Sequence, residues 1–318
     1  MRKVLYDRFG TPAVLRIAEV PEPTPGTDEI LVAVRAAALN PKDILVRKGK
    51  FRWLSGKRFP RGTGYDWAGE VLALGPEVMG VAVGDLCFGM LNGWAGGSLA
   101  ERVIARADEC ARMPAGLSFE QAAAIPLAAQ TAWQALRNLG KLAPGQRVAC
   151  LGASGGVGLF AVQLARALGA EVTASASAGN LPLLTEAGAH HTVDYATQDV
   201  LAGGPYDLVL DVFGNRHFEE AEPALSPNGI FVSTVPSLAI LAASARTLLR
   251  GKRARLVVVR SRSADLEALS ALAEAGALRP IIDSTFDLTD VAAAHARIET
   301  KHTRGKVVVR VPSARTLA

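Results

Sequence analysis

The glycine-rich stretch Arg147–Gly158, RVACLGASGGVG, holds the residues of this sequence that are best suited to chemistry. Within it, Ala153-x-Gly155-x-x-Gly158 is a one-substitution variant of the fingerprint that binds dinucleotide pyrophosphates. Glycine at the turn lets the backbone approach a phosphate closely, and Gly158 lets a helix pack tightly against a sheet. The helix N-terminus offers unpaired N–H groups to the same anion. The pattern predicts a pyrophosphate site at Ala153, Ser154, Gly155, Gly156 and Val157.

A strand and a helix must flank this turn for it to bind phosphate. The apolar run Val148–Leu151 before it is typical of a short, buried parallel strand. Gly169 follows the last apolar position and predicts the end of the helix. The helix itself is indicated by apolar residues at helical spacing: Val157, Phe160, Ala161, Leu164 and Leu168.

An alternation of strands and helices continues after the turn. Six strands with helices between them, opening on a phosphate loop, predict an α/β fold with a doubly wound parallel sheet, the Rossmann arrangement. The further strands are expected at residues 171–174, 191–195, 206–212, 230–235 and 255–259, and helices at 181–187, about 216–225 and about 238–249.

The sequence before residue 115 has a different composition and a different spacing of apolar residues. Ile30, Val32, Val34 and Ala36 alternate with other residues, as in a half-buried strand. Ten glycines fall between residues 62 and 97, a density that suits a small barrel of short strands. Asp43, after Asn40-Pro41, is expected to cap a short helix. The tail after residue 265 predicts two further helices and strands, so the domain boundaries are placed at 1–122, 123–264 and 265–318.

Bulk composition excludes several classes of protein. The 318 residues are 49% hydrophobic and 20% charged, which indicates a globular chain of about two domains. No apolar run reaches the ~18 residues of a membrane span, and the first residues lack a signal-peptide core. We therefore expect a soluble, cytoplasmic protein with no membrane partner. The net charge is +5, and its one basic cluster, residues 250–255, lacks interleaved aromatic residues, so no nucleic-acid partner is expected.

Motifs along essentially the whole chain resemble the medium-chain dehydrogenase/reductase superfamily, in its zinc-independent quinone oxidoreductase (zeta-crystallin-like) branch. The resemblance implies a GroES-like β-barrel catalytic domain, built from both chain ends, with the Rossmann domain inserted. Besides the fingerprint, the stretches that carry it are Asn40-Pro41-x-Asp43, Gly64-Tyr65-Asp66-x-Ala68-Gly69, Val83-Gly84-Asp85, Pro126–Ala132, Glu186–Ala189, Asp194-Tyr195, Asp207–Asp211, Ala275–Pro280 and His302–Val308.

The resemblance also bears on metal binding. Zinc-dependent relatives place a Cys where Lys42 or its neighbours stand, and a His-Glu pair where Tyr65-Asp66 stands. Asp66 is a single oxygen donor, whereas a catalytic zinc needs about three good ligands. Residues 1–86 contain no Cys or His, and Cys87 and Cys110 are expected to be packed core thiols. We predict no metal.

The choice of nicotinamide cofactor depends on the end of the second Rossmann strand. Enzymes that prefer NAD place an acidic residue there, about 20 residues after the fingerprint, but this chain has Ser175 and Ser177. A small hydroxyl leaves room for a 2′-phosphate and does not repel it. Relatives that bind NADPH often add a Lys five residues on, where this chain has Asn180, and Tyr195 matches a tyrosine that reaches the phosphate in similar enzymes. We predict NADPH, with these residues around its phosphate, although an ordinary polar turn is the alternative.

The remaining site residues are implied by the resemblance. Asn40 and Thr131 would lie beside the nicotinamide and the substrate. Tyr65 is either a polar group at the acceptor or a core tyrosine with a satisfied hydroxyl. The cofactor would be lined by Phe213, Gly214, Val235 and Lys306.

Three functions remain open from the sequence. The first is an NADPH-dependent reductase that transfers hydride to a small electrophilic acceptor, a quinone or an α,β-unsaturated carbonyl. The second is a reductase of enoyl thioesters or other activated alkenes. Phe51 disfavours it, because such reductases carry a proton-donating tyrosine near that position. The third is a non-enzymatic NADPH-binding protein.

Two further expectations concern surfaces. Leu256–Val259 is an apolar run that would form the last strand of the sheet, and an exposed edge of that kind favours a homodimer. His295 and His302 are expected at the surface of the tail helix and loop.

Overall fold

The computed structural model describes residues 1–312, which divide into two compact units. Of the described residues, the terminal unit contains 1–127, 260–275 and 280–312. The central unit contains residues 128–259 and 276–279. The chain leaves the terminal unit within helix α4, Pro126–Trp133, and returns to it at Arg260. One unit is therefore assembled from both ends of the sequence, and the other is inserted between them.

The central unit is built on one six-stranded sheet in which every neighbouring pair is parallel. The strand order is β11-β10-β9-β12-β13-β14, so the order reverses between β9 and β12. In an open parallel sheet, that reversal opens a crevice at the carboxyl ends of the strands. The strands are β9 Arg147–Leu151, β10 Glu171–Ala176, β11 His191–Asp194, β12 Tyr206–Asp211, β13 Leu225–Ser233 and β14 Arg253–Leu256.

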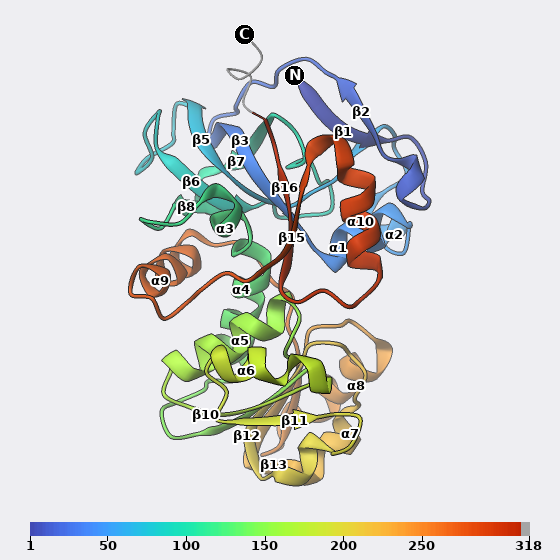
Figure 1. The fold of residues 1–318 in the computed structure, drawn as a ribbon, viewed down its shortest axis with the longest axis vertical. Coiled ribbons are helices and arrows are strands. Elements are labelled where there is room, and N and C mark those ends of the chain that lie inside the picture. The colour runs from blue at the N-terminus through green and yellow to red at the C-terminus, as the bar shows by residue number, and fades with distance from the viewer. Residues whose placement is uncertain (313–318) are drawn as a thin grey trace. The chain divides into compact units, whose positions relative to one another are not determined.

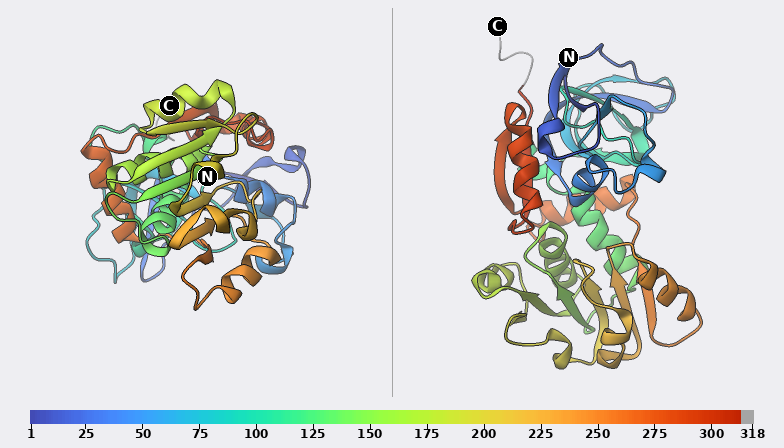
Figure 2. Two further views of the ribbon diagram at one scale, coloured as in Figure 1. Left: turned by 90° about the horizontal axis from the view of Figure 1, so that it is seen from below. Right: turned by 90° about the vertical axis from the view of Figure 1, so that its right-hand side faces the viewer.

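Helices lie on both sides of this sheet, which confirms the doubly wound arrangement (Figure 2). The first, α5, begins at Gly156 and buries the apolar stripe that includes Phe160 and Leu164. The helices α6, after β10, and α8, after β13, are shorter than α5. The helices are α5 Gly156–Ala167, α6 Leu181–Glu186, α7 Phe218–Ala221 and α8 Leu238–Arg246.

The segment between β12 and β13 differs from the sequence prediction. The helix expected over residues 216–225 is only α7 and a 3₁₀ turn, Glu222–Ala224. Pro223 lies in that turn, and proline lacks the N–H that a continuing α-helix needs. Strand β13 consequently begins at Leu225 rather than at residue 230, and its register against β12 shifts near its start.

The terminal unit contains two sheets (Figure 1). The larger has seven strands, in the order β15-β16-β3-β5-β6-β8, with β7 paired to β3. Its strands are β3 Glu29–Leu39, β5 Asp66–Leu74, β6 Leu86–Met90, β7 Arg102–Arg106, β8 Cys110–Arg112, β15 Ile282–Asp287 and β16 Lys306–Arg310. The smaller contains β1 Arg2–Tyr6, β2 Arg16–Glu19 and β4 Arg61–Gly62, and the helices are α1 Pro41–Arg47, α2 Arg52–Ser55, α3 Phe119–Ala123, α9 Ser263–Glu274 and α10 Val291–Glu299.

The core of the terminal unit is shared by the two ends of the chain. The alternating residues Ile30, Val32 and Val34 are buried in β3, as predicted. Val307 and Val309 of β16 and Val291 and Ala294 of α10 belong to the same apolar cluster. In Figure 1, β16 and α10 lie side by side, and residues of the two elements are in contact. The C-terminal segment is therefore required to complete a core that the N-terminal segment begins.

His295 is a correction to the sequence prediction, because it is fully buried rather than at the surface. It lies four residues after Val291 on α10, and that spacing places both on the face that packs inward. Burial, with the nearby Arg47 guanidinium, lowers the pKa of His295 to about 3, so the ring is neutral at ordinary pH. His302, in contrast, is exposed, as predicted.

Among the helices of residues 1–312, none combines the length and the apolar character that crossing a bilayer requires.

The packing of α5 on β9 generates a stability prediction. A Cβ added at Gly158 would lie 2.5 Å from the Cα of Ala153, a backbone atom that cannot move aside cheaply. We expect Gly158→Ala to lower the free energy of unfolding by about 1–3 kcal/mol, measured by urea denaturation. The control is Gly155→Ala, because a Cβ there meets only the carbonyl oxygen of Gly152, at 4.0 Å. Equal stability of the two variants would contradict this packing argument.

Candidate active site

The first turn of α1 fixes the position of Asn40. The carboxylate of Asp43 accepts the backbone N–H of Asn40 at 2.9 Å, which closes the turn. The same carboxylate accepts the N–H of Gly64 at 2.8 Å and the hydroxyl of Thr63 at 3.3 Å. Asp43 therefore has the helix-capping role expected from the sequence, and it also ties α1 to the segment before β5.

Three buried polar side chains meet beside this turn. The Nζ atom of Lys306 lies 3.1 Å from Oδ2 of Asp66 and donates to Oδ1 of Asn40. The Nδ2 atom of Asn40 donates to the same Asp66 oxygen at 2.9 Å. The other carboxylate oxygen accepts the N–H of Leu127 at 2.9 Å. Burial raises the pKa of Asp66, opposed by Lys306 and Asn40, and all three side chains are at most 4% exposed.

This cluster, Asn40–Asp66–Lys306, joins three elements that are far apart in the sequence. Asn40 precedes α1, Asp66 begins β5 and Lys306 begins β16. The amide of Asn40 and the ammonium of Lys306 are both engaged inside the cluster. A contact of Asn40 with the acceptor, or of Lys306 with the cofactor, therefore stays a prediction, whereas their mutual contact is observed.

Tyr65 is buried, and its hydroxyl donates to the carbonyl oxygen of Trp94 at 3.1 Å. Of the two roles left open for Tyr65, this geometry matches the core tyrosine with a satisfied hydroxyl. The Tyr65 ring, however, makes a cation–π contact with Lys42, whose Nζ lies 3.8 Å from the ring centroid. The same Nζ donates to the carbonyl oxygen of Gly93 at 2.7 Å. Burial lowers the pKa of Lys42, opposed by carboxylates including Asp43.

Lys42 is the residue of this region that sequence reasoning did not assign. Its ammonium also lies 5.3 Å from the ring centroid of Trp94, and the Trp94 ring is 4.9 Å from that of Phe51. The signal was present, because Lys42 occupies the variable position of Asn40-Pro41-x-Asp43. Only the fold brings Tyr65 and Trp94 to it.

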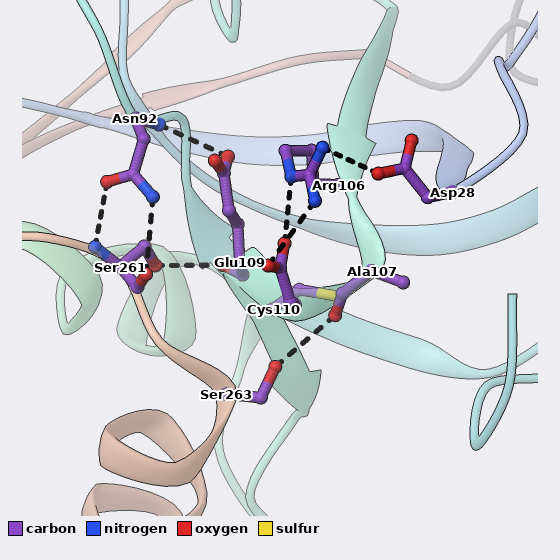
Figure 3. A network of polar contacts seen from close by, with 9 residues as sticks. Asp28, Asn92, Arg106, Ala107, Glu109, Cys110, Ser261 and Ser263 are labelled. Carbon is purple, nitrogen blue, oxygen red and sulfur yellow. Dashed lines mark hydrogen bonds and ion pairs between the residues drawn. The ribbon is translucent and has the colours of Figure 1, made fainter.

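The loop that carries Gly93 and Trp94 is held by a polar network (Figure 3). The side chain of Asn92 exchanges two hydrogen bonds with the backbone of Ser261, at 2.8 and 3.2 Å. The N–H of Asn92 donates to the carboxylate of Glu109 at 3.2 Å, and the Ser261 hydroxyl donates to the Glu109 carbonyl oxygen at 2.8 Å. The segment that re-enters the terminal unit at Arg260 thus anchors the loop beside Lys42.

The central unit contains the predicted phosphate turn between β9 and α5. Gly152 has φ +71°, a conformation that favours glycine, and Gly155 is the N-cap of α5. The N–H of Ala153 donates to the carbonyl oxygen of Ser175 at 2.9 Å, which joins the turn to β10. Gly155 has open space on its Cβ side. The turn therefore leaves room for a bound phosphate at the start of the helix.

Three predicted cofactor residues come together at the end of β10. The amide of Asn180 donates to the hydroxyl oxygens of Ser177, at 3.1 Å, and Ser154, at 3.3 Å. Within residues 1–312, its own Oδ1 is buried and has no hydrogen-bond partner. Ser175 is only 3% exposed, so its backbone rather than its side chain faces the turn residue Ala153.

The other predicted cofactor residues follow the carboxyl ends of neighbouring strands. The carboxylate of Asp211 accepts the N–H groups of Phe213 and Gly214 and so fixes the turn after β12. Phe213 and Val235 expose 49% and 39% of their side chains, although both are apolar. Tyr195 follows β11 and is 61% exposed. Because the sheet is parallel, these residues share one edge with the phosphate turn.

Taken together, the central unit fits a nicotinamide dinucleotide. The turn at Gly155 would hold the pyrophosphate, and Ser177 with Asn180 would hold the ribose end. The exposed apolar side chains of Phe213 and Val235 would pack against the cofactor. Thr131, buried on α4, belongs to this unit, whereas Asn40 and Tyr65 belong to the terminal unit.

Known proteins resemble this chain in both units. A family model described as an alcohol dehydrogenase GroES-like domain matches residues 26–115, and one described as a zinc-binding dehydrogenase matches residues 187–309. The chloroplastic quinone-oxidoreductase QR1 of Triphysaria versicolor is 34% identical over 322 residues, which cover 97% of this chain and 98% of that protein. The mitochondrial NAD(P)H oxidoreductase RTN4IP1 of Danio rerio is 31% identical, covering 96% and 87%.

Among solved structures, the quinone oxidoreductase from Coxiella burnetii superposes with a TM-score of 0.89 and 33% identity, over 98% of this chain and 99% of that one. The chain belongs to the medium-chain dehydrogenase/reductase superfamily, in its quinone oxidoreductase-like branch. It combines a GroES-like domain with a Rossmann domain, and it is an NAD(P)H-dependent oxidoreductase.

The buried cluster generates a stability prediction. Lys306→Met leaves the Asp66 carboxylate buried without its cation, and we expect the free energy of unfolding to fall by about 3–5 kcal/mol in urea denaturation. The double variant Asp66→Asn/Lys306→Met removes the unpaired charge and keeps an acceptor for Leu127. It should recover part of the loss. A double variant no more stable than Lys306→Met would contradict the electrostatic account.

Asp43 generates a prediction about pH. Burial raises the pKa of Asp43 to about 6, from 3.8 for a carboxyl in water, so the folded state holds this proton more tightly than the unfolded chain. Stability from this group is fully present below about pH 4 and is lost as the pH rises to about 6, by roughly 3 kcal/mol. Urea denaturation across this range should show the decline in the wild type. In Asp43→Asn the corresponding decline should be absent, and parallel curves would exclude Asp43 as its source.

Proposed function

We propose that this protein is a zinc-independent, NADPH-dependent reductase that transfers hydride to a quinone or an α,β-unsaturated carbonyl compound. When bound, the reduced nicotinamide supplies the hydride, which carries two electrons. The residues of the chain bind the cofactor, orient the acceptor and stabilise the charge that develops on it. The acceptor is a small electrophilic molecule.

The observation that carries the cofactor choice is the group formed by Ser154, Ser177 and Asn180 at the end of β10. All three side chains are neutral hydrogen-bonding groups, and no acidic residue lies between positions 172 and 185. An acidic residue at this place would bind the ribose hydroxyls of NADH and repel a 2′-phosphate. Hydroxyl and amide groups can donate hydrogen bonds to the 2′-phosphate of NADPH. The group at the end of β10 therefore supports NADPH as the cofactor.

The side chains that could act as metal ligands support a reaction that does not use zinc. In the part of the chain from residue 1 to 312, no three His, Cys, Asp or Glu side chains group closely enough to hold a metal ion. Asp66, which stands where zinc-dependent relatives carry the second residue of a His-Glu pair, is already bound by Lys306, Asn40 and Leu127. Cys87 and Cys110 are buried in the apolar core, as core thiols are.

Two alternatives remain distinct from this proposal. A reductase of enoyl thioesters would need a proton donor near Phe51, and the Phe51 ring packs on Trp94 without a hydroxyl. A non-enzymatic binding protein would bind NADPH and oxidise none of it. The proposal also includes a homodimer that pairs through the edge strand of the central sheet. That strand is β14, Arg253–Leu256, so the prediction that Leu256–Val259 forms it was wrong: only Leu256 of that run lies in the strand.

A comparison of acceptors separates these functions. NADPH oxidation is followed by absorbance with a quinone, a conjugated ketone and an enoyl thioester. Turnover with the first two and little with the third supports the proposal. Turnover with the thioester alone favours the second function. Tight NADPH binding with no oxidation of any acceptor favours the third.

A charge introduced at the ribose end tests the cofactor assignment. Ser177→Asp should weaken NADPH binding by tenfold or more, because a carboxylate repels the 2′-phosphate, and should leave NADH binding nearly unchanged. Ser177 is half-buried at the turn, whereas Ser175 is buried in the strand, so Ser177 is the safer site. The matched control Thr185→Asp adds the same charge on an exposed position of α6. Fluorescence titration measures both cofactors, and equal losses for NADPH and NADH would count against the assignment.

A further inference from the structure

We propose that Lys42 binds the carbonyl oxygen of the acceptor and stabilises the negative charge that forms there during reduction. This inference rests on the proposed function and deepens it. It identifies the acceptor as a molecule that presents a carbonyl oxygen conjugated to the carbon that is reduced. It also assigns the oxygen to one side chain of the terminal unit.

The position of the ammonium is the first observation. Lys42 follows Asn40, the residue predicted beside the nicotinamide, by two positions in the same closed turn. Its Nζ atom donates to the carbonyl oxygen of Gly93 and rests over the face of the Tyr65 ring. An ammonium has three donors, and the Gly93 bond uses one of them. The aromatic face attracts the cation without consuming its remaining hydrogen-bonding capacity.

The second observation is the absence of a neutralising contact. Across residues 1–312, Lys42 forms no ion pair within 4 Å of a carboxylate. The three carboxylates that act on its charge are each bonded elsewhere: Asp43 to backbone N–H groups, Asp66 to Lys306, and Glu109 to the N–H of Asn92. A half-buried ammonium without a counter-ion is suited to bind an oxygen that becomes negative.

The third observation is that the surroundings of Lys42 are held in place before any ligand binds. The Tyr65 hydroxyl and the Arg61 guanidinium both donate to the carbonyl oxygen of Trp94. Asn92 is held by Ser261 and Glu109, so the loop is fixed on both sides of Gly93 (Figure 3). A donor positioned in advance stabilises a developing charge without the cost of reorganisation.

The chemistry that follows is balanced. The reductant is the reduced nicotinamide of the proposed function. The acceptor gains a hydride at its β-carbon, where a C–H bond forms and the carbon–carbon π bond breaks; the C–H bond that breaks in exchange belongs to the reductant, which is oxidised by two electrons. The electron pair moves through the conjugated system to the carbonyl oxygen, so an enolate forms from either acceptor; the enolate from a quinone becomes aromatic only when it later tautomerises to the hydroquinone. Lys42 hydrogen-bonds that oxygen and can give it a proton, and one proton taken up from the solvent then restores the ammonium, so that the acceptor gains one hydride and one proton in total.

A purely structural lysine is the competing account. In that case, the aliphatic part of Lys42 would matter for packing against Tyr65, and the charge would not. Lys42→Met separates the two accounts, because methionine keeps an unbranched apolar side chain of similar length and removes the ammonium. Lys42→Gln offers a second uncharged variant if methionine disturbs folding.

The kinetic arm compares steady-state reduction of a conjugated ketone and a quinone. We expect Lys42→Met and Lys42→Gln to lower kcat/KM by about 10²–10³-fold, as loss of an oxyanion donor does, and Lys42→Arg to restore much of it. NADPH binding, measured by fluorescence titration, should be unchanged. The control is Lys50→Met, which removes an exposed lysine of the same segment and should leave kcat/KM unaltered.

The binding arm does not depend on turnover. 4-Nitrophenol is a planar phenol whose absorbance reports its ionisation, and its phenolate mimics the anionic oxygen. Bound to the wild type, it should ionise at a pH lower by about one unit or more, because an adjacent cation favours the phenolate. Bound to Lys42→Met, it should lose this shift, whereas Lys50→Met should keep it.

The two arms distinguish this inference from the proposed function. A wild type that reduces no acceptor overturns the proposed function, and the nitrophenol titration then still supports or overturns the role of Lys42 in binding an anionic oxygen. A wild type that is active, with uncharged Lys42 variants that match it in kcat/KM and in the titration, overturns the inference and leaves the proposed function standing.

Discussion

The buried ion pair between Lys306 and Asp66 is the interaction on which the terminal unit depends. Charges at this depth are costly unless they are paired and hydrogen-bonded, so only an arrangement that brings β16, β5 and the turn before α1 together is stable. Asn40 completes the pair, and Asp43 closes the same turn. The position of Lys42 follows from this arrangement, because Lys42 lies between those two residues in the chain.

The two units solve different physical problems. The cofactor proposed for the central unit is a polyanion, and this unit offers it backbone geometry and neutral donors: a glycine turn, a helix N-terminus and a serine–asparagine group. In the role we propose for Lys42, the terminal unit holds a single oxygen whose charge changes during the reaction. The ammonium of Lys42 lies over the Tyr65 ring and donates to Gly93, and hydrogen bonds at Tyr65 and at the Asn92 loop hold both of these contacts in place. A pre-positioned charge is effective because nothing needs to move when the reaction occurs.

Much of the fold was predictable because its signals are local. Side-chain periodicity predicts the apolar strands and the helix that begins at Gly156. It also predicts the change from barrel-like to α/β sequence before the Rossmann strands. The boundaries near Pro223 were predicted less well, since a single proline shortened a helix and allowed a strand to begin early. His295 was misplaced because a polar residue at an apolar helix position is not visible as buried until the helix has a partner.

The sequence by itself determined the glycine turn after β9, the capping of α1 by Asp43 and the neutral side chains that follow β10, because each depends on residues within a few positions of one another. Tertiary structure alone decided that Lys306 pairs with Asp66, 240 positions away. It also decided that the Lys42 ammonium contacts the Tyr65 ring and the carbonyl oxygen of Gly93. The physical reason is that buried charges and aromatic faces act through space. Their partners are chosen by the packing of the sheet, which no local pattern specifies.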